Sequence, residues 1–239
     1  MTQETLKNPS VVTIPDPTGL DLAIYYLQTR IAQLEWLQKS FGRAFTMPVR
    51  VREEKRLEPM VYQGGGEYYN VMPNDALRSY SFWRVRGKRG VNEWVPLNNH
   101  GNFFLSDTVD LIVWCDLKAV DPSKDYNFKE VLIRDVFRYL DDLNNVVVTG
   151  VFDDKVEDIF SGYTLQPNHR DMLMFPYTAF RVEMTVSYGV ECDPAMIPVP
   201  AGPLPIQATE GDMIMFINGK WQKISLQYLQ TKLQDVPIG

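Results

Sequence analysis

The last quarter of the chain most constrains its architecture, because an alternating strand there runs into a dense series of prolines. From Phe180 to Tyr188, apolar and polar residues alternate, as in a strand with one face on a core. Each proline of the following series fixes φ and lacks an N–H donor, so the backbone is expected to stay extended and semi-rigid. The sequence therefore predicts a body that ends in an arm. The prolines are Pro194, Pro198, Pro200, Pro203 and Pro205.

The arm is predicted to carry a small structured unit at its end. Asn218-Gly219 lies between two strand-like runs, 213–217 and 220–224, which is the strongest short hairpin signal in the chain. Ser225 is expected to cap a short helix with Leu226, Leu229 and Leu233 on one face. Such an arm suits a subunit that docks on copies of itself. Ile217, Trp221 and Leu229 are therefore candidate interface residues.

Two main helices are predicted in the body. Apolar residues recur at steps of three and four from Leu20 to Phe41, and Gly42 is a plausible stop. The second helix runs from Phe128 to Leu143 and opens with a capping pattern at Asn127 and Glu130. For the first helix, a seam against a partner helix stays open as an alternative to a stripe on the core.

Strands account for most of the remaining body. The run 109–117 is apolar at nearly every position after Asp110, which predicts a central strand covered on both faces. Gly87–Gly90 is expected to be a tight basic turn of a hairpin. The fold class is therefore α+β, a mostly antiparallel sheet packed by two main helices. Further strands are expected at 45–51, 60–63, 80–86, 91–95 and 146–149, with one helical turn at 155–160.

Three regions follow from these elements. Residues 1–19 are predicted to be an extended leader, and residues 20–193 form the α+β body. Residues 194–239 are the proline-rich arm, which ends in the hairpin and short helix.

The net charge of the chain argues against a broad nucleic-acid-binding surface. The net charge is −6, and a surface of that sign does not grip nucleic acid over a broad area. One local basic cluster has aromatic neighbours and leaves three alternatives open: a nucleic-acid-binding module, a solvated hairpin tip, and a dock for an acidic surface of another subunit. The cluster comprises Arg84, Arg86, Lys88 and Arg89, near Phe82, Trp83 and Trp94.

The chain carries no constellation typical of a catalytic, cofactor or metal site, so an enzyme is not the favoured reading. His100 and His169 lie far apart, and neither is at ligand spacing from Cys115 or Cys192. Gly64–Gly66, beside the aromatic middle of the chain, keeps a small-ligand-binding protein or an enzyme open as the alternative. No apolar run is long enough to span a bilayer, so a cytoplasm-like compartment without membrane contact is expected.

Several stretches resemble virion proteins of tailed bacteriophages. The strand 111–117, the helix 128–143 and the strand 180–188 resemble the small α+β domain of tail-terminator and related neck proteins. The segment 20–41, with Leu34-Glu-Trp-Leu37 and Phe41-Gly-Arg-Ala44, is similar to virion proteins of phages that infect gut Bacteroidetes, including the crAss-like group. Together these patterns cover about half of the chain.

The resemblance implies a structural protein without an active site. It would form a homo-oligomeric ring, six- or twelvefold, as a connector or tail terminator at the head–tail junction of a virion assembled in the host cytoplasm. Its partners would be copies of itself and neighbouring portal, neck or tail proteins, and DNA would pass through an acidic lumen without sequence-specific binding. Candidate subunit contacts in the body are Arg181, Glu183, Thr185 and Ser187 on the polar strand face and Arg86, Lys88 and Arg89 at the basic tip.

Overall fold

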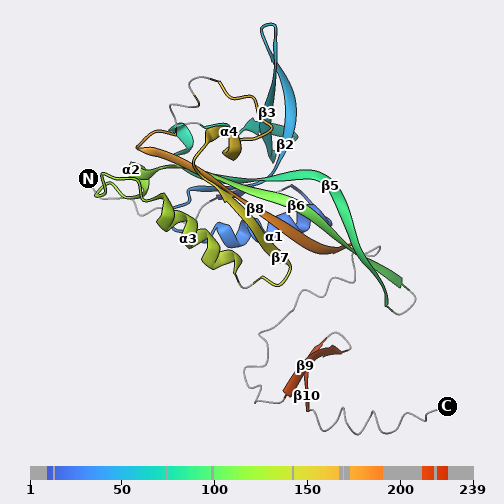
Figure 1. Ribbon diagram of the computed structural model, residues 1–239. Coiled ribbons are helices and arrows are strands. Elements are labelled where there is room, and N and C mark those ends of the chain that lie inside the picture. Colours follow the sequence, from blue (N-terminus) through green and yellow to red (C-terminus); the bar gives the residue numbers. More distant parts are fainter. Residues whose placement is uncertain are drawn as a thin grey trace, which may run out of the picture. The chain divides into compact units, whose positions relative to one another are not determined.

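The computed structural model describes residues 10–12, 14–73, 75–97, 100–141, 143–166, 169, 173–190, 212–217 and 220–225. The chain divides into two compact units, residues 1–190 and residues 191–239. The first unit contains a large sheet with helices packed on it (Figure 1), which confirms the expected α+β class and the mostly antiparallel sheet.

The sheet of the first unit has the strand order β4-β3-β2-β5-β6-β8-β7, and β1 adds to β2 outside this path. The pairs β1–β2 and β2–β5 are parallel, and the other pairs in this sheet are antiparallel. Because β1 belongs to the sheet, part of the expected leader is docked on the body. The strands are β1 (Ser10–Val12), β2 (Lys39–Val51), β3 (Glu54–Gly64), β4 (Glu67–Asn70), β5 (Ser79–Leu97), β6 (His100–Asp116), β7 (Val146–Phe152) and β8 (Tyr177–Val190).

Two helices cover one face of the sheet, α1 (Leu20–Ile31) and α3 (Lys129–Leu140) (Figure 1). Their apolar sides meet the apolar residues of the central strands, including Leu111, Val182 and Met184. The backbone N–H of Lys129 donates to Asn127 Oδ1 at 3.0 Å, but Phe128 occupies the N-cap and makes no side-chain capping bond, so the expected capping pattern is only partly formed. The alternation of β8 is likewise confirmed, since its apolar set lies on the helix side.

The other face of the sheet has its own core beneath the short helix α4 (Val156–Ile159). Tyr80, Phe82 and Trp114 pack there with Phe160 and Tyr163 from the segment that follows α4. Strand β6 is therefore buried on both faces, as its apolar run predicts. Cys115 is a free, buried thiol in this strand, and its burial raises its pKa.

The first helix is shorter than the sequence predicts. It ends at Ile31, and residues 32–37 continue as turns in which Leu34 and Leu37 are still buried. From Lys39 the chain is strand β2, so Phe41 is a sheet residue. The turns after Ile31 still bury Leu34 and Leu37 in the same core as the helix. The apolar spacing of three and four therefore continues beyond the last helical residue, and the helix length predicted from it was too great.

The Gly87–Gly90 segment is not a hairpin turn. Strand β5 runs through it, and the pairing with β6 shifts between Arg86 and Gly90. Gly87 has a φ of 65°, which suits glycine. Because Arg86 faces Thr108 and Gly90 faces Ser106, the extra residues form a bulge inside a longer hairpin. The pairing of that hairpin continues to Leu97 opposite His100.

Other elements expected from the sequence have counterparts in the structure, and some lie outside the described residues. The hairpin of the second unit consists of β9 (Asp212–Ile217) and β10 (Lys220–Ser225), with Ile217 opposite Lys220. The helical turn at 155–160 corresponds to α4. Gly64–Gly66 forms the turn between β3 and β4. The proline series, Cys192, the short helix after Ser225 and Leu229 lie outside the described residues.

The short segments α2 (Leu117–Val120) and η1 (Asp75–Leu77) complete the body. Among the described residues, no helix has the length and the apolar character needed to cross a membrane.

Candidate functional site: a buried charge cluster and exposed strand edges

The polar face of β8 lies on the side of the sheet opposite α1 and α3. Arg181 is only 2% exposed, because its side chain is enclosed by its own chain. The expectation that Arg181 contacts a neighbouring subunit is therefore corrected. Glu183, Thr185 and Ser187 on the same face are half-buried and keep some exposed surface.

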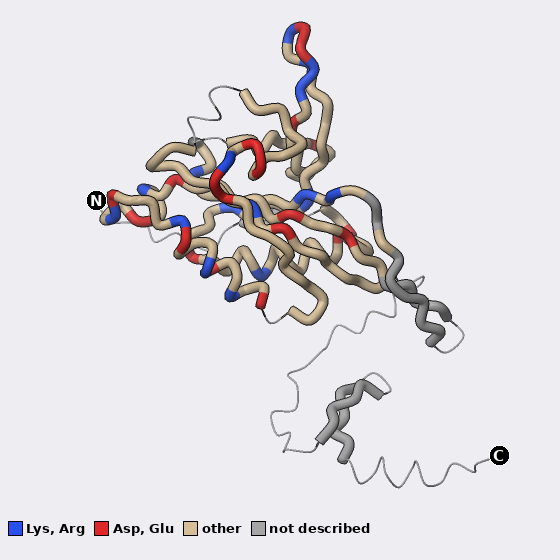
Figure 2. Tube along the Cα trace, in the orientation of Figure 1, with Lys and Arg blue, Asp and Glu red and all other residues tan. Residues whose placement is uncertain are grey.

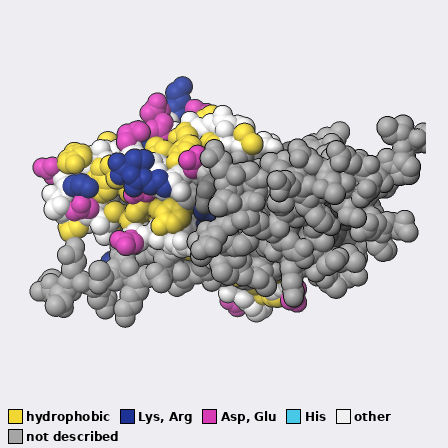
Figure 3. All heavy atoms as spheres, turned by 90° about the horizontal axis from the view of Figure 1, so that it is seen from below, with side chains coloured by type: hydrophobic (Ala, Val, Ile, Leu, Met, Phe, Trp, Pro, Cys, Tyr) yellow, Lys and Arg dark blue, Asp and Glu magenta, His cyan; other side chains and the backbone are white. Residues whose placement is uncertain are grey.

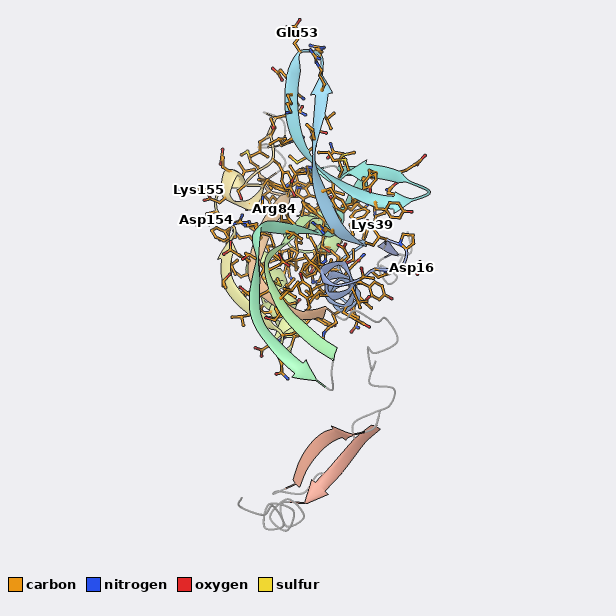
Figure 4. All side chains as sticks on the ribbon, turned by 90° about the vertical axis from the view of Figure 1, so that its right-hand side faces the viewer. Asp16, Lys39, Glu53, Arg84, Asp154 and Lys155 are labelled. Atoms are coloured by element: carbon orange, nitrogen blue, oxygen red, sulfur yellow. The ribbon has the colours of Figure 1, made fainter. Side chains whose placement is uncertain are left out.

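A cluster of charges explains the burial of Arg181. Asp110 in β6 is fully enclosed, and its Oδ2 lies 3.0 Å from Arg84 Nε and 2.6 Å from Arg86 Nε. Arg181 Nη1 lies 3.9 Å from the same oxygen. Arg86 Nη1 reaches Glu183 Oε2 at 2.8 Å, so it bridges the two carboxylates. The cluster thus joins three adjacent strands, β5, β6 and β8 (Arg84 is labelled in Figure 4).

The segment after α4 closes over these arginines. Ser161 Oγ accepts hydrogen bonds from Arg181 Nη1 at 2.7 Å and from Arg84 Nη2 and Arg86 Nη2 at 3.2 and 3.3 Å. Arg84 also lies over the ring of Tyr163, and Arg181 lies 3.8 Å from the ring centroid of Phe152. The cluster therefore holds the α4 segment and the edge strand β7 on the sheet.

Burial controls the electrostatics of the cluster. It raises the pKa of Asp110 above its ordinary value, although Arg84 and Arg86 oppose that shift. Burial likewise raises the pKa of Tyr163 to about 12. A buried carboxylate with several guanidinium partners is costly to disrupt, because removal of one member leaves the others uncompensated. This arrangement can rigidify the sheet.

The cluster changes the interpretation of the basic residues. Arg84 and Arg86 direct their guanidinium groups to Asp110 and Ser161, so they are engaged within the chain. Arg86 keeps a side-chain exposure of 30%, which leaves it a limited role in outside contacts. Lys88 and Arg89 lie in β5, and their side chains are outside the described part of the structure.

Elsewhere, the described surface is mixed in charge. On the face that Figure 3 presents, basic and acidic side chains stand among hydrophobic ones. Along α3, for example, Asp135 pairs with both Arg134 and Arg138. These pairs do not favour a broad nucleic-acid surface on this helix.

The Gly64–Gly66 loop, which the sequence leaves open as a ligand site, lies between β3 and β4. Gly64, Gly65 and Gly66 all have positive φ, and the space beside each is open, which fits a turn between strands. A hollow beside α1 and β2, lined in part by Asp21, Gln28 and Arg43, holds about 20 Å³, roughly the space of one water molecule. Within the described residues, no group of three histidine, cysteine or acidic side chains is placed to hold a metal ion.

The β2–β3 hairpin extends away from the rest of the sheet (Figures 1 and 4). Its outer part pairs only within itself, from Val49 opposite Arg56 to Val51 opposite Glu54. Basic and acidic residues occur together at its tip (Figure 2), where Glu53 is labelled in Figure 4. An isolated two-stranded ribbon is marginally stable in water, so this projection is typical of an element that packs against another molecule.

Strand β7 is the second exposed element, because it ends the sheet beyond β8. Its sequence Val-Val-Val-Thr-Gly-Val-Phe has no charge and no proline, and Val147 is 62% exposed. Sequence reasoning identified this strand but missed its edge position. It also missed Asp110 and Ser161 as cluster members. An acid beside the apolar run 111–115 of a central strand was the available signal for Asp110.

Ile217 and Trp221, the candidate contacts of the second unit, lie in β9 and β10. No known protein-family model matches the chain, and a search of curated proteins finds no significant match.

Proposed function

We propose that the protein is a structural subunit that assembles with copies of itself into a ring, as a connector or tail terminator at the head–tail junction of a tailed phage. The observation that carries self-assembly is the projecting β2–β3 hairpin, whose outer residues form strand pairs with each other, from Val49 opposite Arg56 to Val51 opposite Glu54. The phage assignment rests on the resemblance of strands 111–117 and 180–188 and helix 128–143 to neck and terminator domains.

The internal construction of the body supports this role. The Asp110 cluster ties three strands and the α4 segment into a stiff unit, while an exposed hairpin and an uncharged edge strand stand outside it. A rigid body with unpaired strand edges is suited to repeated strand-mediated contacts. Neighbouring portal, neck or tail proteins and a DNA channel belong to the same proposal, and so do a six- or twelvefold ring and assembly in the host cytoplasm.

The experiment is a mass measurement of the purified full chain by light scattering over a wide concentration range, followed by negative-stain imaging of large species. Closed rings of one stoichiometry are expected. A protein that stays monomeric at every concentration, alone and mixed with purified portal and neck proteins of its phage, would contradict the proposal.

A further inference from the structure

The outer edge of β7 lacks most of the protection that natural edge strands carry. Val147 and Val151 expose 62% and 38% of their surface, and the strand holds neither lysine nor proline. Its one protective feature is an irregularity in pairing with β8 between Val148 and Gly150. Edge strands usually avoid unwanted pairing through charges, prolines or coverage, so an uncharged exposed edge indicates a strand-pairing site.

The opposite edge of the sheet, formed by β4 and part of β3, has protection against strand pairing that β7 lacks. Strand β4 is four residues long and begins at Glu67, which is exposed. The backbone of Leu57 in β3 already exchanges hydrogen bonds with Thr164, through the Thr164 hydroxyl and backbone N–H. The contrast singles out β7 as the edge open to a further strand.

The second unit contains a strand that matches this edge. Among the described residues, β9 pairs only with β10, which forms a two-stranded sheet of marginal stability by itself. From Met213 to Ile217, β9 is uncharged and apolar, whereas β10 carries Lys220 and Lys223. The lengths also agree, since β9 has six residues and β7 has seven.

The connection between the units is long enough for an exchange between copies. Residues 191–211 separate β8 from β9, and a proline-rich segment of this length can span up to about 65 Å. A compact domain of the size of residues 1–190 has a radius of gyration of about 16 Å. The hairpin can therefore reach the far side of an adjacent body.

We propose that β9 of one copy pairs with the outer edge of β7 in a second copy and extends that copy's sheet by the β9–β10 hairpin. Donor and acceptor are different elements, so the contact repeats head to tail and can close into a ring. This inference rests on the self-assembly proposed above and assigns one of its interfaces.

The test replaces the two exposed valines of the edge strand with lysine in the full chain, as the double variant Val147→Lys, Val151→Lys. The matched control is the double variant Tyr126→Lys, Met174→Lys, which also adds two positive charges, at side chains that are 57% and 68% exposed and lie outside β7. Thermal melting by circular dichroism verifies that both variants fold. The edge variant is expected to raise the concentration for half-assembly by about tenfold or more, and the control to leave it unchanged.

Hydrogen–deuterium exchange on the unmodified protein gives an independent readout. On assembly, the amides of residues 146–152 and 212–217 are expected to gain protection together. Normal assembly of the edge variant, or no gain of protection at 146–152, overturns the β7 contact and leaves ring formation intact. A wild-type chain that never assembles overturns both proposals, so the two failures are distinguishable.

Discussion

At the residue scale, the carboxylate of Asp110 is the centre of the charge cluster, with three arginines around one of its oxygens. It faces Arg84 across one strand pair and Glu183 across the other. Arg86 contacts both carboxylates, so its positive charge offsets the repulsion between Asp110 and Glu183. One acid in a central strand thereby organises side chains from three strands.

Asp110→Asn keeps the shape of the side chain and removes its charge. We expect a loss of about 3–5 kcal/mol in the free energy of unfolding, because buried arginines lose their counter-charge. Urea unfolding followed by tryptophan fluorescence measures the loss. The control Asp154→Asn alters an acid with 90% side-chain exposure and is expected to change stability by about 0.5 kcal/mol or less. A similar small effect for both variants would contradict a coupled cluster.

His169 makes stability depend on pH. Burial and the nearby charge of Arg56 lower its pKa, and Nδ1 accepts a hydrogen bond from the Gln166 N–H at 3.3 Å, which requires an unprotonated nitrogen. The folded state therefore binds this proton less readily than the unfolded chain. The resulting stabilisation is present above the ordinary pKa of about 6.5 and is lost as pH falls through the folded pKa.

Chemical denaturation at pH 7.5 and 5.0 tests this dependence. In His169→Gln the stability lost between these two pH values is expected to be smaller than in the unmodified protein, because the titrating group is gone. An identical loss in both proteins would assign the pH dependence to other groups.

At the element scale, the β5–β6 and β2–β3 hairpins are longer than is needed to cover the cores of the body. Strand β5 has 19 residues and β6 has 17, and their pairing absorbs a bulge and continues beyond it. The β2–β3 hairpin similarly continues past its last contact with the body. Segments that add little to their own core are candidates for contact with other subunits.

Shortening β2–β3 separates assembly from stability. Replacement of residues 49–56 by Asn-Gly joins Pro48 to Leu57, which already face each other, through a favoured two-residue turn. The thermal midpoint is expected to change by only a few degrees, because the removed residues pair among themselves. Light scattering is expected to show weaker assembly. Full assembly of the shortened protein would remove the hairpin from the interface.

At the scale of the whole molecule, the chain combines a stiff sheet unit with a second unit on a proline-rich connection. This division assigns rigidity to the body and reach to the arm. Subunits built this way can hold neighbours together without enlarging their own core.

Deletion of residues 194–239 tests the division directly. The truncated body is expected to keep its circular dichroism spectrum and thermal midpoint, because the main cores lie within residues 1–190. Its mass by light scattering is expected to be that of a monomer. Unchanged assembly of this variant would show that the arm is dispensable.

Local patterns determined the elements whose partners lie close in the sequence or whose periodicity is strict. The alternation of β8, the apolar run of β6 and the antiparallel pairing of β9 with β10 follow from side-chain period and turn chemistry. These patterns also led to the α+β class, because strict period-2 and period-3.6 segments need facing layers.

Only the tertiary structure decided where helix α1 stops, that β5 passes through Gly87–Gly90, and that Arg181 is buried. Each outcome depends on a partner distant in sequence. Gln28 Nε2 donates to the Ser40 carbonyl at 2.7 Å, which binds α1 to the start of β2. Arg181 meets Asp110 and Ser161 across the sheet. Periodicity reports which side of an element is apolar, but long-range pairing decides which polar groups find partners inside the fold.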